Sequence, residues 1–239
     1  MGQDLKDKVV YITGGSRGIG YGIAYTLLKC GMKVAISGRS IDHLDNAAEK
    51  LSREGDLLAI QSDVSKHGDE ERAIREVADR FGKLDVLVAN AGVGHFKPID
   101  ELTENEWHET IDTNLTGVYH SVKAAIPLLK QSSGYIITMA SLAGTNFFET
   151  ASAYNASKFG LVGFTQAIML DLRKHGIKVS TIMPGSVASY FNDHTPDEKD
   201  GWKIQPEDIG KIVADLLMMN PRTLPSKIEV RPSMPGGSK

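Results

Sequence analysis

The sequence is poor in cysteine. Only Cys30 among its 239 residues is a cysteine, so no intramolecular disulfide can form, and no cluster of cysteine and histidine has zinc-site spacing. We therefore expect a protein of a reducing compartment that binds no metal. Cys30 itself, in "LLKCG", is expected to be a small core residue at a helix end.

The sequence also lacks an excess of positive charge and any long apolar run. Its 27 Lys and Arg residues are interspersed with 30 Asp and Glu residues, and the net charge of −3 argues against a nucleic-acid partner. No apolar run is long enough to span a bilayer, and the first residues carry neither a signal-peptide pattern nor a myristoylation signal. We expect a cytoplasmic protein without a membrane partner.

What the sequence does contain is an alternation of short apolar runs with segments of helical period. The runs are "VVYIT", "KVAIS", "LLAIQSD", "LDVLVANAG", "GYIITMAS", "IKVSTIMPG" and "KIEVRP". Short and almost wholly apolar runs are typical of strands buried on both faces. The pattern predicts an α/β protein with one domain over 1–239. Its fold is a doubly wound Rossmann fold, with a mostly parallel seven-stranded sheet and helices on both faces.

The segments between the runs predict the helices. They cover 18–30, 41–53, 67–81, 103–131, 152–175 and 206–219. Pro127 is expected to kink the fourth helix or to split its end, because proline cannot donate the hydrogen bond of a helix interior. Residues 231–239, "RPSMPGGSK", are expected to be loose.

The first apolar run leads directly into a glycine-rich turn, "TGGSRGIG". Gly14, Gly18 and Gly20 allow a sharp turn and a close approach to a pyrophosphate, which the N–H groups of the following helix then hold. The spacing is not G-x-G-x-x-G, and the Gly-Lys-Ser/Thr ending of a nucleoside-triphosphate loop is missing. A tight turn without a ligand is the alternative, but its place between strand and helix favours a dinucleotide.

The end of the second run indicates which dinucleotide. An acidic residue there would accept from the ribose 2′-hydroxyl of NAD, whereas an arginine accommodates the 2′-phosphate of NADP. In "ISGRS" the acidic position holds Gly38, and Arg39 follows. Arg17 lies in the glycine turn, so two guanidinium groups could converge on one phosphate. Alone, Arg39 could equally be a solvated loop cation; with Arg17 it favours NADP(H).

Two further strand ends carry candidate contacts. Asp63 could accept from an adenine amino group or cap the next turn. Asn90 and Gly92, in "ANAG", form another turn of small residues at the edge of the sheet where the ligand of an open α/β fold lies.

A tyrosine and a lysine four positions apart occur three times, as Tyr25/Lys29, Tyr119/Lys123 and Tyr154/Lys158. A carbonyl reductase needs a proton donor, and a nearby cation favours the phenolate of tyrosine. Only the third pair follows a buried strand by a short loop, with Ser141 at the tip of that strand. The sequence therefore favours Tyr154 and Lys158.

In this order the motifs resemble those of the short-chain dehydrogenase/reductase family over essentially the whole chain. They are "TGGSRGIG", "DV" at 63–64, "NAG" at 90–92, the asparagine of "DTNLTG", Ser141, "YNASK" and "PG" at 184–185. The resemblance implies that Tyr154 is the general acid in reduction and the general base in oxidation. Lys158 would lower the pKa of Tyr154 and hold the nicotinamide ribose. Ser141 would bind the substrate carbonyl, and Asn114 would support a water-linked proton path to Lys158.

For two of these residues a structural role is the alternative: a turn or N-cap for Ser141, and a helix–side-chain hydrogen bond for Asn114. Family members also contact the nicotinamide carboxamide near "PGSVAS", where Ser189 stands in place of the commoner threonine. The full set of expected cofactor contacts is Gly14, Ser16, Arg17, Gly18, Ile19, Gly20, Arg39, Asp63, Val64, Asn90, Gly92, Tyr154, Lys158, Pro184, Gly185, Val187 and Ser189.

Substrate specificity is expected in the segment 186–205, a loop that can act as a lid. It contains Tyr190, Phe191 and Trp202, which either line an apolar pocket or pack the lid onto the body. Other residues that could border this pocket are Phe147, Phe148, His95, His194 and Met183.

The leading hypothesis is an NADPH-dependent ketone or aldehyde reductase that acts on a 3-oxoacyl thioester or a more general carbonyl compound. One alternative is a dehydrogenase that oxidises a sugar or secondary alcohol, and another is an NADP(H)-binding redox sensor without turnover. The intact Ser141, Tyr154 and Lys158 argue against the sensor. By resemblance, the partners are a small carbonyl or alcohol substrate and further copies of the chain, as a homodimer or homotetramer.

Overall fold

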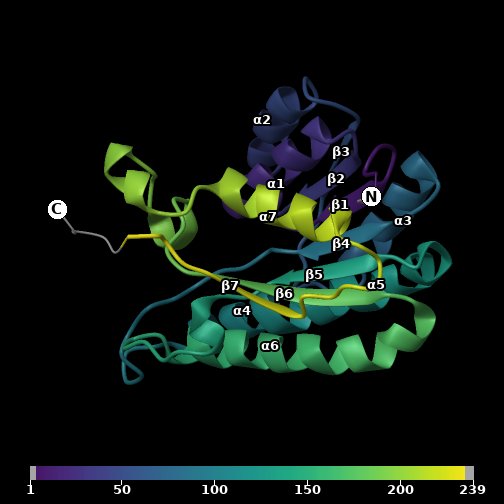
Figure 1. The fold of residues 1–239 in the computed structure, drawn as a ribbon. Coiled ribbons are helices and arrows are strands. Elements are labelled where there is room, and N and C mark those ends of the chain that lie inside the picture. Colours follow the sequence, from purple (N-terminus) through teal and green to yellow (C-terminus); the bar gives the residue numbers. More distant parts are fainter. Residues whose placement is uncertain (1–3, 235–239) are drawn as a thin grey trace.

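The computed structural model describes residues 4–234 and consists of one parallel sheet between two layers of helices (Figure 1). Within this range the sheet has seven strands in the order β3-β2-β1-β4-β5-β6-β7, and every neighbouring pair is parallel. The strands are β1 Val9–Ile12, β2 Lys33–Gly38, β3 Leu57–Gln61, β4 Val86–Ala89, β5 Tyr135–Met139, β6 Lys178–Pro184 and β7 Lys227–Val230. The predicted doubly wound Rossmann fold is confirmed. Of the tail that was expected to be loose, 235–239 lies outside the described residues.

The helices lie where the sequence predicts them, with one difference. They are α1 Gly18–Lys29, α2 Ile41–Leu51, α3 Asp69–Phe81, α4 Glu104–Ile111, α5 Gly117–Ser132, α6 Ser152–Leu172 and α7 Pro206–Met218. Short 3-10 turns cover Leu142–Gly144, Arg173–His175, Phe191–Asp193 and Glu198–Trp202. No helix in residues 4–234 is long and apolar enough to cross a membrane.

The predicted fourth helix is interrupted, but not at Pro127. Between α4 and α5 the chain forms a π-helical turn over Asp112–Thr116, whereas α5 continues through Pro127, so the expected split of the helix end at the proline is wrong. Proline removes the hydrogen bond to the carbonyl of Lys123, and both residues are exposed, so water can satisfy that carbonyl. A single π-turn within a helix is often found at a functional site, and this one contains Asn114.

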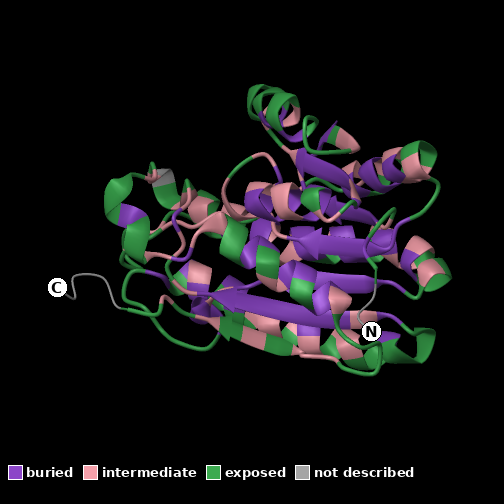
Figure 2. Ribbon diagram, turned by 45° about the horizontal axis from the view of Figure 1, so that its top comes forward, coloured by how far each residue is buried: buried purple, intermediate pink, exposed green. Residues whose placement is uncertain are grey.

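Two cores explain why the strand sequences are apolar without interruption. In β1 the side chains of Val10 and Ile12 join the core under α1, α2 and α7, whereas Val9 and Tyr11 join the core under α3, α5 and α6. Successive side chains of a strand point to opposite faces, so a strand covered on both sides needs apolar residues at every position. Figure 2 shows the central strands buried along their length and exposed residues on the outer sides of the helices.

The order of the strands fixes the position of the functional site. β1 and β4 are neighbours, and the chain winds outward from them in both directions, toward β3 and toward β7. Turns that follow parallel strands lie at one edge of the sheet, and Figure 1 shows the segment 186–205 and the loop that precedes α4 on this same side of the molecule. The switch between β1 and β4 is where an open α/β sheet binds its ligand.

Candidate active site

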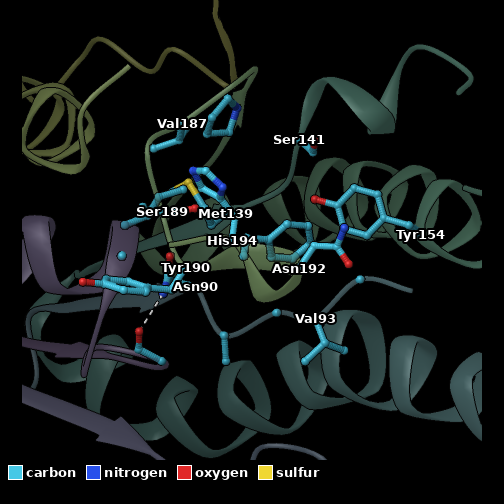
Figure 3. A pocket seen from close by; sticks show the side chains of 18 of the residues that line it. Asn90, Val93, Met139, Ser141, Tyr154, Val187, Ser189, Tyr190, Asn192 and His194 are labelled. Atoms are coloured by element: carbon cyan, nitrogen blue, oxygen red, sulfur yellow. Dashed lines mark hydrogen bonds between the residues drawn. The ribbon is translucent and has the colours of Figure 1, made fainter. Parts of the chain in front are cut away.

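A cleft of about 1440 Å³ lies along the carboxyl ends of β1 to β6. Figure 3 shows Ser141, Tyr154, Val187 and Ser189 around it. Of the predicted cofactor and catalytic residues, all line this cleft except two, Gly20 and Asn114. Those that line it are Gly14, Ser16, Arg17, Gly18, Ile19, Arg39, Asp63, Val64, Asn90, Gly92, Ser141, Tyr154, Lys158, Pro184, Gly185, Val187 and Ser189.

The glycine turn after β1 is held in shape by its own close packing and by Asn90. Gly14 has a φ of 64°, a region that favours glycine, and a Cβ on Gly20 would lie 2.3 Å from the Gly14 carbonyl oxygen. Asn90 Nδ2 donates to the carbonyl oxygens of Thr13 and Gly14 at 2.9 and 3.1 Å. The Asn90 amide therefore ties this turn to the end of β4.

Helix α1 begins without a side-chain partner for its first N–H groups. Its N-cap residue, Arg17, makes no capping hydrogen bond, and the first turn has no acidic residue. A Cβ on Gly18 would meet only Ser189, at 3.4 Å, so the space above the turn is open as far as the segment after β6. Free N–H groups and the positive end of the helix dipole attract anions. The turn therefore fits the pyrophosphate of a dinucleotide.

Arg39 already has a partner within the protein. Both Arg17 and Arg39 line the cleft, and Gly38 leaves the end of β2 without an acidic residue. Arg39 Nη1 lies 3.2 Å from Oε1 of Glu109 on α4, and the two side chains are 53% and 42% exposed. Sequence reasoning missed Glu109, because no local pattern shows which loop a helix position faces.

Asp63 caps the turn that follows β3, which is one of its two predicted roles. Its Oδ1 accepts hydrogen bonds from the backbone N–H and the hydroxyl of Ser65, at 3.1 and 2.7 Å. Asp63 also lines the cleft, so capping does not remove it from reach of a bound ligand.

Tyr154 and Lys158 lie in the first turns of α6. Lys158 is buried, its Nζ donates to the Met139 carbonyl oxygen at 2.9 Å, and burial lowers its pKa to about 8. Nζ is 5.6 Å from the centroid of the Tyr154 ring. Burial raises the pKa of Tyr154 to about 12, although the neighbouring Ser141 hydroxyl lowers it. Burial thus outweighs the hydrogen bond with Ser141 in setting the pKa of Tyr154, and the effect of Lys158 on this pKa stays a prediction.

Ser141 has the structural role that was the alternative in its prediction. It is the N-cap of the 3-10 turn Leu142–Gly144, and its Oγ accepts from the backbone N–H of Ala143 at 3.1 Å. A hydroxyl has one donor and two acceptor sites, so capping leaves the Ser141 proton available for a carbonyl oxygen in the cleft.

Asn114 uses its side chain to hold neighbouring elements together. Its Oδ1 accepts from the N–H of Val93 at 2.8 Å, and its Nδ2 donates to the Val93 carbonyl and the Ser157 hydroxyl. These partners lie in the loop after β4 and on helix α6, so the side chain of Asn114 makes structural hydrogen bonds, as its alternative prediction had it. A Cβ on Gly92 would lie 3.3 Å from Asn114 Oδ1 and 3.6 Å from Lys158 Nζ, so both groups border this glycine.

Three aromatic rings meet at the end of the cleft where the substrate is predicted to bind. Phe96, in the loop after β4, and Phe191, in the segment 186–205, lie 5.3 and 5.4 Å from the Tyr154 ring and 6.1 Å from each other, between centroids. A Cβ on Gly94 would lie 2.5 Å from Phe191 and 2.8 Å from Phe96, so a glycine is required for both rings to fit. Sequence reasoning missed Phe96, which belongs to no motif.

The segment 186–205 is folded around a small polar centre. Its two ends pair where Ala188 N donates to the Ile204 carbonyl at 2.9 Å. Within it, the buried Asp200 carboxylate bonds His194 Nε2 at 2.5 Å and Lys203 Nζ at 2.6 Å, and the Lys203 and His194 side chains lower its pKa to about 2. The loop is therefore held in shape while its side chains face the cleft.

Not every residue expected near the substrate reaches the cleft. Met183 is buried in the core on one face of the sheet, and Phe147 is 84% exposed and stacks on Phe159 instead. Those that do line the cleft are Phe148, Tyr190, Phe191, Trp202, His95 and His194. In the described part of the chain no three His, Cys, Asp or Glu side chains gather as metal ligands would.

Comparison with known proteins agrees with this geometry. The model of the family described as short chain dehydrogenase matches residues 8–200. An uncharacterised oxidoreductase of Staphylococcus aureus is 34% identical over 229 residues, which cover 95% of this chain and 98% of that protein.

Two solved structures are also similar over almost the full length. An alcohol dehydrogenase of the archaeon Thermococcus sibiricus, complexed with 5-hydroxy-NADP, has a TM-score of 0.90 and 31% identity, over 95% of this chain and 97% of that one. A metagenomic short-chain oxidoreductase in complex with NADP has a TM-score of 0.85 and 32% identity, over 98% of this chain and 100% of that one. The chain belongs to the short-chain dehydrogenase family, a family of oxidoreductases.

Proposed function

We propose that this protein is an NADPH-dependent oxidoreductase that reduces a ketone or aldehyde carbonyl to an alcohol. One observation carries the proposal: the Tyr154 ring, the Ser141 hydroxyl and the buried Lys158 amine line the same cleft as the uncapped start of α1. A dinucleotide held at α1 therefore brings its reactive ring toward a proton donor and a carbonyl-binding hydroxyl.

Different residues of the cleft would bind different groups of the proposed cofactor. The glycine turn would hold the pyrophosphate, Arg17 and Arg39 the 2′-phosphate, and Lys158 the nicotinamide ribose, with Ser189 near the carboxamide. The similar proteins from Thermococcus sibiricus and from a metagenome, solved with 5-hydroxy-NADP and NADP, support the preference for NADP(H). When bound, the nicotinamide supplies the hydride to the substrate carbon.

Tyr154 would donate the proton to the carbonyl oxygen in reduction and take it back in oxidation. With a pKa of about 12 it is protonated at neutral pH, as a general acid must be. The phenolate that remains needs a cation nearby, and Lys158, whose pKa is about 8, is mostly charged at pH 7. Ser141 would donate to the same carbonyl oxygen. Asn114, beside Gly92 and Lys158, would support a water-linked path that returns the proton.

The substrate end favours an apolar carbonyl compound. Phe96 and Phe191 cover the Tyr154 ring, and Trp202 and Leu142 also line the cleft. We propose that one domain carries both cofactor and substrate sites, that 186–205 acts as its lid, and that the substrate is a 3-oxoacyl thioester or a more general ketone or aldehyde.

The proposed assembly is a homodimer or homotetramer through the helices α4, α5 and α6. Phe159 and Leu170 of α6 are 37% and 58% exposed, which is unusual for large apolar side chains of an isolated chain. Sedimentation equilibrium would give the mass of the assembly, and a monomer at micromolar concentration would contradict this part of the proposal.

The test of the activity is NADPH oxidation with a panel of ketones, aldehydes and 3-oxoacyl thioesters. The same panel is run with NADH, and NADP⁺ is offered with sugars and secondary alcohols. We expect reduction with NADPH and its loss in Tyr154→Phe. Turnover of alcohols alone would favour the dehydrogenase alternative, and tight NADPH binding without any turnover would favour the redox sensor.

A further inference from the structure

Arg39 and Glu109 form an ion pair at the end of the cleft where the adenosine of the proposed cofactor would bind. Arg39 follows β2, whereas Glu109 lies on α4, 70 positions later, and both line the cleft. β2 belongs to the half of the sheet that contains β1 to β3, and α4 precedes the half that contains β5 to β7. The pair therefore joins the two halves at the place where a 2′-phosphate would need the Arg39 guanidinium.

Glu109 is itself fixed by a second contact. His95 Nε2 lies 3.0 Å from Glu109 Oε2, while Arg39 takes Oε1 at 3.2 Å. The His95 ring also lies 3.9 Å from Glu106, whose carboxylate pairs with Lys97 at 2.7 Å. The contact with His95, and then that with Arg39, lowers the pKa of Glu109. The carboxylate thus stays charged, and one of its two oxygens has a partner other than Arg39.

We propose that Glu109 is a positioning residue that limits the preference of the cleft for NADPH over NADH. It acts through Arg39, which it holds in the free protein, and its own charge opposes a phosphate that approaches the same guanidinium. This inference rests on the proposed binding of a nicotinamide dinucleotide. It concerns the strength of cofactor selection, which the presence of Arg17 and Arg39 alone does not determine.

The exposure of the Arg39–Glu109 ion pair determines whether Glu109 strengthens or weakens binding of a 2′-phosphate. Both side chains are about half exposed, so the ion pair is weak and a phosphate that carries nearly two negative charges can displace the carboxylate from Arg39. After displacement, Glu109 remains beside the phosphate because His95 still holds it. Removal of its charge should therefore strengthen binding of the 2′-phosphate and leave a ligand without that phosphate unaffected.

The test is calorimetric titration of the free protein with adenosine 2′,5′-bisphosphate and with 5′-AMP, at low salt. Glu109→Gln is expected to lower the Kd for the bisphosphate about tenfold and to change the Kd for 5′-AMP less than twofold. Glu109→Asp, which retains the charge, should behave as the wild type. Glu104→Gln is the matched control, since Glu104 lies on the same helix, is 88% exposed and does not line the cleft.

A double-mutant cycle tests whether Glu109 acts through Arg39. In an Arg39→Ala background, the effect of Glu109→Gln should shrink to about the remaining repulsion between two charges, well below tenfold. Weaker binding of the bisphosphate to Glu109→Gln, or equal changes for both ligands, would overturn the inference. If the wild type bound neither ligand, both the inference about Glu109 and the proposed function would fail. If it bound both but Glu109→Gln had no effect, only the inference would fail.

Discussion

The same Tyr-x-x-x-Lys spacing produces two very different pairs in this molecule. On α1, Lys29 Nζ donates to the Tyr25 hydroxyl at 2.8 Å and lies 4.7 Å from the centroid of its ring. On α6, Lys158 Nζ bonds the Met139 carbonyl instead and lies 5.6 Å from the Tyr154 ring. The closer tyrosine–lysine contact is thus the one on the surface, away from the cleft.

The two tyrosine–lysine pairs differ in their burial and in the direction of their pKa shifts. Lys29 is exposed, and its hydrogen bond with Tyr25 raises its pKa, whereas burial lowers the pKa of Lys158 to about 8. Tyr154, in the wall of the cleft, has its pKa raised to about 12. Shifts caused by burial at a cleft are typical of functional groups. Spacing brings a tyrosine and a lysine together, but burial of the lysine beside the cleft makes the pair on α6 a candidate for chemistry.

The largest effect is expected from Tyr154→Phe. Loss of the hydroxyl removes the proposed proton donor, so kcat should fall about 10²- to 10⁴-fold while NADPH binding stays the same. Stopped-flow measurement of NADPH oxidation in a single turnover would report the chemical step. The same change at Tyr25, Tyr25→Phe, is the matched control. Full activity of Tyr154→Phe would remove the distinction between the two pairs.

The variant Lys158→Met tests whether Lys158 is buried, through the pH dependence of the free energy of unfolding. Between pH 8 and 10.5 the unfolded chain keeps a proton on Lys158 that the folded protein has already released. More protons bound in the unfolded state mean that stability rises with pH over this window, by about 3 kcal/mol in total. The free energy of unfolding of the wild type, relative to the variant, should increase by about this amount from pH 7 to above pH 10.

Urea denaturation at several pH values measures that difference. The raised pKa of Tyr154 acts above pH 10, and both proteins share it. Lys29→Met is the matched control: Lys29 has a raised pKa, so its variant should not show the increase between pH 8 and 10.5. A difference between wild type and Lys158→Met that does not change with pH would show that Lys158 is not effectively buried.

Ser141→Ala should have a smaller effect on catalysis. The variant loses one hydrogen bond to the reacting oxygen, which corresponds to about a 10- to 100-fold fall in kcat/KM. Ser141→Thr keeps a hydroxyl and should recover part of the rate. If Ser141→Ala lost stability but kept its rate, the residue would serve only as the cap of the turn that begins at Leu142.

The parts of the site that the sequence predicted are those fixed by topology. Glycines after β1, Asn90 after β4 and Ser141 after β5 follow strands whose period is strong, and parallel strands bring their ends to one edge. Tyr154 and Lys158 follow by a short connection. For these residues, recognition of the strands was enough to predict that they meet.

The residues that sequence reasoning missed depend on contacts between distant segments. Phe96 reaches Tyr154 because Gly94 leaves room for two rings, one of them from the segment 186–205. Glu109 contacts Arg39 because α4 lies against the loop after β2, although the two residues are 70 positions apart in the sequence. The π-turn at Asp112–Thr116 contains Asn114, whose side chain bonds Val93 in the loop after β4, 21 positions earlier. No local propensity contains this information.

The smallest effect is expected from the double variant Tyr25→Phe with Lys29→Met. An exposed tyrosine–lysine contact contributes little to stability, because water replaces both partners. The rate of NADPH oxidation and the urea midpoint should stay within experimental error of the wild type. Tyr119→Phe on α5, where the tyrosine is 48% exposed, should behave in the same way. A slower chemical step in either variant would mean that a pair outside the cleft influences catalysis. Position in the wall of the cleft would then not be sufficient to explain why Tyr154 differs from the other two tyrosines.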